Sequence, residues 1–294
     1  MLITWSDFFS LYISLPHFTQ HFSVFMYADD TALLCAHEST TELISTANRE
    51  LETLCSWFIS NKLVVNVNKT KCIIFRSSRK IIHENLPSVQ WLGTPIALVN
   101  NITYLGIILD ENLHWKPYIQ ALCKKLAAAC FALYKCRDYF GNDILRIIYF
   151  SIFQSQLSYC IESWGHTYRS YLEPLRVLQK RAIRFISHSG YNAHTAPLFK
   201  QMDILPLQSL LEYRTVLTIH TCLKDNYPLH SSLFCIPPLC TRNATHRNFL
   251  LPKTKNVYRE RRMAHVGIKL WNKLPSELKH SKTLPESLKK YYKQ

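Results

Sequence analysis

The stretch from Phe25 to Cys35 reads FMYADDTALLC and places two adjacent carboxylates, Asp29 and Asp30, between two apolar runs. The runs FSVFMY and TALLCA have the length and composition of short strands, and the ADD between them consists of residues that turns tolerate. The stretch therefore predicts a strand, a tight turn and a second strand, with both aspartates at the tip of a hairpin.

Adjacent carboxylates at a hairpin tip are suited to holding a divalent cation, because the flanking strands fix their position. Mg²⁺ prefers hard oxygen ligands, and two-metal nucleotidyl transfer uses such ions to activate a hydroxyl and hold the leaving phosphates. The simpler alternative is a surface turn with two solvated aspartates, since Asp is common in turns. The bare pair does not decide between these alternatives.

The residues after the hairpin predict a helix and then more strands. Ser39 and Glu42 fit a capping box, and the apolar residues between Leu43 and Phe58 follow the helical period up to a stop at Asn61. The segments 62–75 and 102–110 alternate or are rich in β-branched residues, so we expect a strand in each.

The chain becomes helical and more basic from about Trp115. An amphipathic helix over 115–137 presents an apolar face made of Ile119, Leu122, Leu126, Cys130 and Leu133. Further helices are expected near 143–160, 171–187 and 207–224, followed by a Pro-containing loop over 226–255 and a basic, partly helical tail. The predicted class is α+β.

The composition indicates an acidic partner. Lys and Arg number 35 against 20 Asp and Glu, a net charge of +15, which makes a polyanion such as nucleic acid the first partner to consider. The simpler alternative is a generally basic surface without a specific partner. No apolar run reaches the length of a membrane span, so no membrane partner is expected.

The ten cysteines are scattered singly, without a CxxC pair, and the first 18 residues make no convincing secretory leader. We therefore expect free thiols and an intracellular location, cytoplasmic, nuclear or both. Cys235, Cys240 and His246 form at best three ligands of a zinc site, and no fourth is evident.

Several motifs occur along the chain in the same order as in a known family of polymerases. YADD at 27–30, WFISNKLVVNVNKTKCIIF at 57–75 and YLGIILDENLHWKPYI at 104–119 resemble the catalytic box, the next palm motif and the following hairpin of reverse transcriptases of non-LTR (LINE-like) retrotransposons. Later segments, including LQKRAIRFI, LEYR and LWNKLP, look like the C-terminal region of the Jockey- and RTE-like branches. The resemblance extends from about Phe25 to about Tyr291.

The resemblance implies a role for each matching residue. Asp29 would be the metal ligand, Asp30 its less directly coordinating neighbour, and Lys69 a proton donor to the leaving pyrophosphate. Mg²⁺ or Mn²⁺ would be the cofactor, and an RNA template with an RNA–DNA hybrid or DNA primer the partner. The residues that would contact primer or nucleic acid are Tyr27, Tyr104, Leu105, Gly106, Lys116, Lys124, Lys125, Lys180, Arg181 and Arg184. For Lys180, Arg181 and Arg184, a solvated helix face is an equally valid interpretation.

The chain departs from the family in one respect. Reverse transcriptases need a further aspartate from a strand before the YADD hairpin, and the only acid before Phe25 is Asp7, too close to leave room for the intervening helix. We expect a partial palm over 1–112, a thumb-like region over 113–190 and a helical C-terminal region of unknown role over 191–294. Such a chain is expected to be inactive without the N-terminal half of the palm. The alternative is a non-catalytic RNA- or DNA-binding remnant of the same element.

Overall fold

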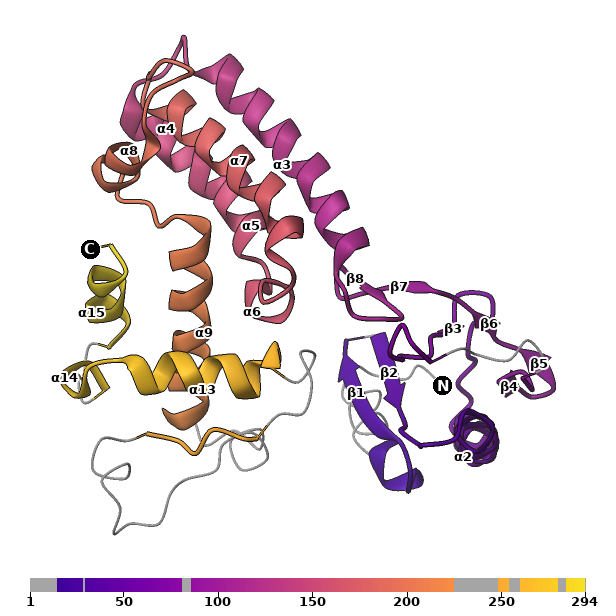
Figure 1. The fold of residues 1–294 in the computed structure, drawn as a ribbon. Coiled ribbons are helices and arrows are strands. Elements are labelled where there is room, and N and C mark those ends of the chain that lie inside the picture. The colour runs from indigo at the N-terminus through magenta and orange to yellow at the C-terminus, as the bar shows by residue number, and fades with distance from the viewer. Residues whose placement is uncertain are drawn as a thin grey trace. The chain divides into compact units, whose positions relative to one another are not determined.

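The computed structural model describes residues 15–28, 30–80, 86–224, 248–253, 260–279 and 284–293. By its internal contacts the chain divides into two compact units, Met1–His114 and Trp115–Gln294. Figure 1 shows strands only in the first unit and helices dominating the second. The chain is therefore mixed helix and sheet, which is compatible with the predicted α+β class.

The hairpin predicted around the two aspartates is present. After a 3₁₀ turn, η1 (Leu15–Phe18), strands β1 (Ser23–Tyr27) and β2 (Asp30–Leu34) pair antiparallel, from Ser23 opposite Leu34 to Tyr27 opposite Asp30. Side chains alternate across the pair, so Val24, Met26 and Leu33 pack against the core of the first unit. The opposite face is exposed.

Helix α2 (Thr40–Ser60) confirms the helix predicted after the hairpin. Its N-cap is Ser39, whose Oγ accepts the N–H of Glu42 at 3.5 Å, and its C-cap is Asn61. The buried side of α2 meets apolar residues from the segments on either side. The core of the first unit consists of Leu15, Leu51, Leu54, Cys55, Trp57, Trp91 and Ile96.

The strand predicted over 62–75 is wrong except at β3 (Lys71–Cys72). Asn66 starts a turn: its carbonyl accepts the N–H groups of Lys69 and Thr70, and its Oδ1 accepts the Lys69 N–H at 3.2 Å. Leu63, Val65 and Val67 still point into the core, so the alternation in the sequence reports burial rather than a paired strand.

Strand β3 pairs in parallel with β6 (Ala97–Leu98), and β4 (Gln90–Trp91) pairs with β5 (Thr94–Pro95). The single strand predicted over 102–110 is instead a hairpin of β7 (Asn101–Tyr104) and β8 (Ile107–Asp110). Within the described residues, the strands thus form four separate two-stranded sheets.

The second unit begins with α3 (Lys116–Cys136), whose predicted apolar face is fully buried. One continuous helical segment follows: α4 (Asn142–Ile148), the π-helical turn η2 (Tyr149–Gln154) and α5 (Ser155–Ser158). After the short α6 (Ile161–Trp164), helix α7 (Arg169–Ile186) packs along α3. These helices match the ones predicted near 143–160 and 171–187.

Helix α8 (Thr195–Gln201) was not predicted, whereas α9 (Leu207–Lys224) matches the predicted range. Helix α13 (Met263–Lys273) lies across α9 in Figure 1, and α14 (Ser276–Lys279) and α15 (Leu284–Tyr291) complete the helical tail. Trp271 of α13 and Ile219 of α9 share one core cluster. In the part of the chain that the structure describes, no helix is long and apolar enough to cross a membrane.

Candidate functional site

The tip of the β1–β2 hairpin brings Tyr27 and Asp30 directly opposite each other. Strand β1 ends at Tyr27 and β2 begins at Asp30, so the connection is two residues long. Ala28 in this connection has a φ of 51°, the left-handed conformation that two-residue hairpin loops require at their first position. Asp29, the predicted metal ligand, lies outside the described residues.

Tyr27 and Asp30 lie on the exposed face of the hairpin. Tyr27 is 67% exposed, Phe25 on the same face is 52% exposed, and Asp30 is also exposed. Aromatic side chains of this size are usually covered in a folded protein, and contiguous exposed apolar surface usually marks an interaction site. The carboxylate of Asp30 is therefore accessible beside an uncovered aromatic surface.

The described residues do not form a metal site. Carboxylate oxygen is the ligand type that Mg²⁺ prefers, so the chemistry of Asp30 fits. No three His, Cys, Asp or Glu side chains within the described ranges gather closely enough to hold a metal ion, so Asp30 does not complete a site there. Cys235, Cys240 and His246, the alternative zinc ligands, lie outside the described residues.

Lys69, the predicted proton donor, occupies the exposed turn that Asn66 starts. Its backbone N–H is bound there, and its side chain extends from the turn into solvent. No hydrogen bond or ion pair joins described Lys69 to described Asp30. The structure therefore does not bring these two predicted catalytic residues into contact.

Tyr104, Leu105 and Gly106, predicted to contact the primer, form the turn between β7 and β8. Leu105 and Gly106 have φ values of 45° and 78°, so both central positions adopt the left-handed conformation of a type I′ turn. A glycine is favoured at the second of these positions because it has no Cβ. Gly106 is thus a turn residue and not a bulge within a strand.

Asp110, which sequence reasoning missed, fixes the end of this second hairpin. Its Oδ1 accepts the N–H groups of Asn112 at 3.2 Å and His114 at 3.0 Å, and its side chain is buried. The Nη2 group of Arg76 donates to both carboxylate oxygens of the neighbouring Glu111, each at 3.1 Å. The signal in the sequence was the Asp that precedes Glu-Asn in LDEN, a composition typical of a carboxylate-stabilised turn.

The predicted nucleic-acid residues of the second unit occupy two packed helices. Lys116, Lys124 and Lys125 are exposed on α3, which contains no acidic residue among its 21 positions. Because successive helical residues are rotated by about 100°, Lys124 lies about 80° around the helix from Lys116, and Lys125 lies about 180° from Lys116. Helix α3 thus presents positive charge on two sides.

The three basic residues of α7 have different environments. Arg184 donates its Nε–H to the carbonyl of Ala193 at 3.0 Å, so part of its guanidinium holds the chain after α7. Arg181 is exposed and lies over the ring of Phe185, 5.5 Å from its centroid. Lys180 is half-buried, 100° around the helix from Arg181. The three do not form one uniform basic patch.

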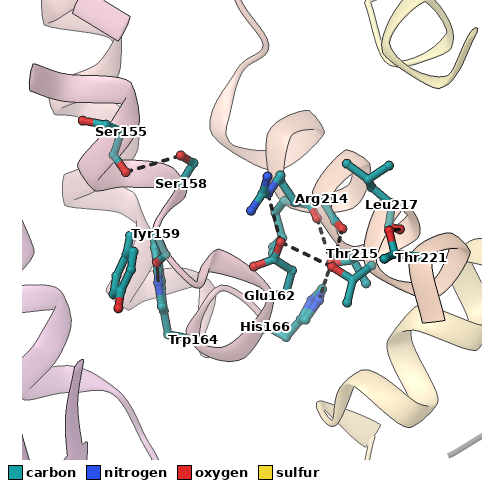
Figure 2. Close-up of polar contacts among 12 residues, drawn as sticks. Ser155, Ser158, Tyr159, Glu162, Trp164, His166, Arg214, Thr215, Leu217 and Thr221 are labelled. Carbon is teal, nitrogen blue, oxygen red and sulfur yellow. Dashed lines mark hydrogen bonds and ion pairs between the residues drawn. The ribbon is translucent and has the colours of Figure 1, made fainter. Parts of the chain in front are cut away.

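A polar cluster that sequence reasoning missed joins α6 to α9 (Figure 2). The Arg214 Nε–H donates to Glu162 Oε1 at 2.9 Å, and the Thr218 hydroxyl reaches the same oxygen at 3.5 Å. His166 Nε2 lies 3.0 Å from Thr215 Oγ1, and the Thr215 hydroxyl donates to the Leu211 carbonyl at 2.7 Å. Burial lowers the pKa of His166 to about 4.

A cavity of about 450 Å³ lies beside this cluster. His166, Leu172, Arg176, Gln208 and Val266 are among the residues that line it, so its wall mixes apolar and cationic groups. Gly165 permits this packing: an added Cβ would lie 2.5 Å from Leu211 Cδ1 and 2.6 Å from the Ile161 carbonyl. The Trp-Gly-His sequence at 164–166 was the available signal.

Comparison with known proteins identifies relatives by sequence. The chain is 26% identical over 172 residues to "RNA-directed DNA polymerase from mobile element jockey" of Drosophila funebris, which covers 58% of this chain and 18% of the relative. It is 24% identical over 192 residues to "Probable RNA-directed DNA polymerase from transposon BS" of Drosophila melanogaster, covering 64% and 21%. It is 23% identical over 188 residues to "Retrovirus-related Pol polyprotein from type-1 retrotransposable element R1" of Bradysia coprophila, covering 63% and 18%.

The aligned part spans about a fifth of the length of these three relatives. No model of a protein family matches the chain. No solved structure matches it significantly either. The relationship therefore rests on the sequence similarity, which extends over about 60% of the chain.

Proposed function

We propose that this chain, a relative of the reverse transcriptases of non-LTR retrotransposons, carries the part of such a polymerase from the YADD box onward. In this proposal the first unit is the end of the palm and α3 begins the thumb. The observation that carries the proposal is the two-residue hairpin connection that joins Tyr27 to Asp30 in a chain whose matched relatives are RNA-directed DNA polymerases.

The geometry of the hairpin supports a catalytic role for its tip. Core packing on the other face holds the backbone of β1 and β2 in place. The carboxylate of Asp30 therefore extends from a supported strand while remaining open to solvent. The exposed ring of Tyr27 lies beside it and offers a surface on which the end of a primer strand can rest. Bound divalent cations would supply the activation of the primer hydroxyl and the stabilisation of the leaving phosphates.

Nucleotidyl transfer requires more carboxylate ligands than this hairpin supplies. We propose that the third comes from a palm segment outside these 294 residues. The exposed face with Phe25 and Tyr27 supports this, because another segment is needed to cover it. Strands β1 and β2 also form a two-stranded sheet in the described structure, so each offers an outer edge for further pairing.

Primer extension tests the proposal in two forms of the protein. The 294-residue chain is assayed alone, and it is also joined at Phe25 to the preceding part of the jockey polymerase, each with an RNA template, a DNA primer and Mg²⁺ or Mn²⁺. We expect extension only from the joined protein. Extension by the chain alone, abolished by Asp29→Asn, contradicts the need for a third carboxylate from outside.

A second function is favoured by the basic helices. With the exposed lysines of α3 and the incomplete metal site, the chain could bind RNA or DNA without chemistry. A joined protein that is folded and binds an RNA–DNA hybrid in a salt-dependent manner, but does not extend a primer, supports this alternative. In either case we propose that the protein works inside the cell, in the cytoplasm, the nucleus or both.

A further inference from the structure

Two exposed aromatic rings lie on α3, and one of them contacts the half-buried Phe185 of α7. Phe131 is 62% exposed and Tyr134 46% exposed, although both lie in a long, well-packed helix. The buried face of α3 is already filled by Leu126, Cys130 and Leu133, so these rings are not needed for its core. Leaving two large rings in water forgoes the stabilisation that burial of such side chains provides.

Contacts between the two helices hold the rings in place. Tyr134 of α3 and Phe185 of α7 lie with their ring centroids 5.4 Å apart and their planes tilted by 56°. Below them, the Cys130 thiol approaches the Leu178 carbonyl at 3.5 Å, which fixes the neighbouring turns of the two helices. Tyr134 and Phe185 are therefore held against each other before any binding, which reduces the entropy that a ligand must overcome.

Cations accompany each end of this surface. Lys135 lies over the ring of Phe131, with Nζ 5.6 Å from its centroid, and the Arg181 guanidinium lies over Phe185. Helix α3 carries four lysines and no acid. Asp138, the acid just beyond α3, is paired with Arg137 at 3.8 Å. The surface combines π faces with positive charge, the combination with which proteins bind single-stranded nucleic acid.

We propose that the aromatic strip formed by Phe131, Tyr134, Lys135, Arg181 and Phe185 binds unpaired nucleotides of an RNA or DNA strand by base stacking. The inference deepens the proposed function and rests on it only for the biological source of the strand. A duplex offers phosphates to such a surface but keeps its base faces stacked inside, whereas an unpaired base presents a whole π face. The ligand class is therefore a single strand and not a hybrid duplex.

Fluorescence anisotropy of the full chain tests the strip with two labelled strands of about 12 nucleotides, within the usual site size of such surfaces. One is an oligodeoxyadenylate and the other an abasic strand with the same phosphates. We expect the adenylate to bind about 25-fold more tightly than the abasic strand, because stacking on each of the two exposed rings contributes about fivefold. Equal affinity for the two strands overturns the inference.

Substitutions identify the rings that cause the preference for the adenylate strand. Phe131→Leu and Tyr134→Leu keep apolar bulk on exposed positions, so the fold is preserved, and each should lower the preference for adenylate about fivefold. Phe131→Trp keeps a π face and should retain the preference. Tyr191→Leu is the control, since Tyr191 is even more exposed, at 82%, but lies outside the strip. Loss of preference in the Tyr191 variant, or none in the strip variants, contradicts the assignment.

An RNA–DNA hybrid of the same length separates this inference from the proposed function. If the hybrid binds tightly while the adenylate binds no better than the abasic strand, the strip is not a stacking surface and the polymerase-derived function stands. If the adenylate preference is found but the joined protein extends no primer, the strip stands and the catalytic proposal fails.

Discussion

Tyr27 and Asp30 face each other as the last partners of the β1–β2 register, and both side chains lie on the uncovered face of the hairpin. This relationship links the local sequence to the proposed chemistry. A two-residue connection holds the aromatic ring and the carboxylate at one tip, which is where the proposed function places the primer end and the cation. The other face of the hairpin packs on the core of the first unit, to which α2 contributes Leu51 and Leu54.

Ala28 should be a source of backbone strain in this tip. Its φ of 51° lies in the left-handed region, where a Cβ costs roughly 1 kcal/mol. We expect Ala28→Gly to raise the free energy of unfolding by about 0.5–1 kcal/mol in urea denaturation. Ala47→Gly, within α2, is the control and should lower it by about 1 kcal/mol. Loss of stability in both variants contradicts the left-handed conformation.

Lys116 and Lys124 should contribute to nucleic-acid binding through charge alone. We expect Lys124→Gln to weaken binding of an RNA–DNA hybrid similarly for all sequences and to reduce the slope of log K against log salt by about 0.9. Lys116→Gln should behave alike, because both residues are exposed on α3, which contains no acidic residue. Filter binding across several salt concentrations measures the slope. The exposed Lys269 of α13 is the control. An equal effect of Lys269→Gln would mean that the nucleic acid does not bind preferentially at α3.

Gly165 should tolerate no side chain. An alanine there places its Cβ within 2.6 Å of the Ile161 carbonyl and the Leu211 side chain, and the carbonyl cannot move without breaking the turn after α6. We expect Gly165→Ala to destabilise the second unit by about 2 kcal/mol, measured by thermal unfolding. Gly190→Ala meets no atom within 4 Å and lies outside the helices, so it should change the melting temperature little. Equal effects of the two substitutions would show that the packing around Gly165 is looser than described.

His166 should make the stability of the second unit depend on pH. Its pKa in the folded chain is lowered by burial to about 4, below the ordinary 6.5, so the unfolded chain binds a proton first as the pH falls. The folded state therefore loses up to about 3 kcal/mol between pH 6.5 and pH 4 and gains nothing above pH 6.5. Urea denaturation across this range measures the effect.

His166→Gln should remove this pH dependence while keeping a group that can bond to Thr215. The exposed His194 is the matched control, and His194→Gln should leave the dependence in place. A pH profile that His166→Gln does not flatten would assign the dependence to other groups.

Periodicity and capping residues were sufficient to predict the long helices. Ser39 and Glu42 set the start of α2, and the apolar positions of α3 are the ones the structure buries. The prediction of a strand over 62–75 failed because alternation of apolar residues reports only which side chains face the core. Whether the segment pairs with another strand depends on the turn that Asn66 starts. The turn at Leu105 was not predicted within the range 102–110, because Gly106 is the only residue there that is typical of a turn.

The candidate site could be predicted only in part. The YADD hairpin is encoded within a few residues, so its tip was predictable, and the resemblance located the turn at Gly106. The contacts of Glu162 with Arg214 and of Arg184 with Ala193 depend on how distant segments pack. The tilt of Tyr134 against Phe185 depends on the packing of α3 on α7. No local pattern specifies these arrangements.

The most direct test of the central claim is the Mg²⁺ dependence of single-turnover primer extension by the joined protein, compared with its Asp29→Asn and Asp30→Asn variants. If the hairpin tip holds the catalytic metal, Asp29→Asn abolishes extension at every Mg²⁺ concentration. Asp30→Asn is then slower and needs more Mg²⁺, because it is the less directly coordinating neighbour. Wild-type rates from Asp29→Asn at saturating Mg²⁺ would contradict the claim, since the carboxylate would then have no part in binding the metal.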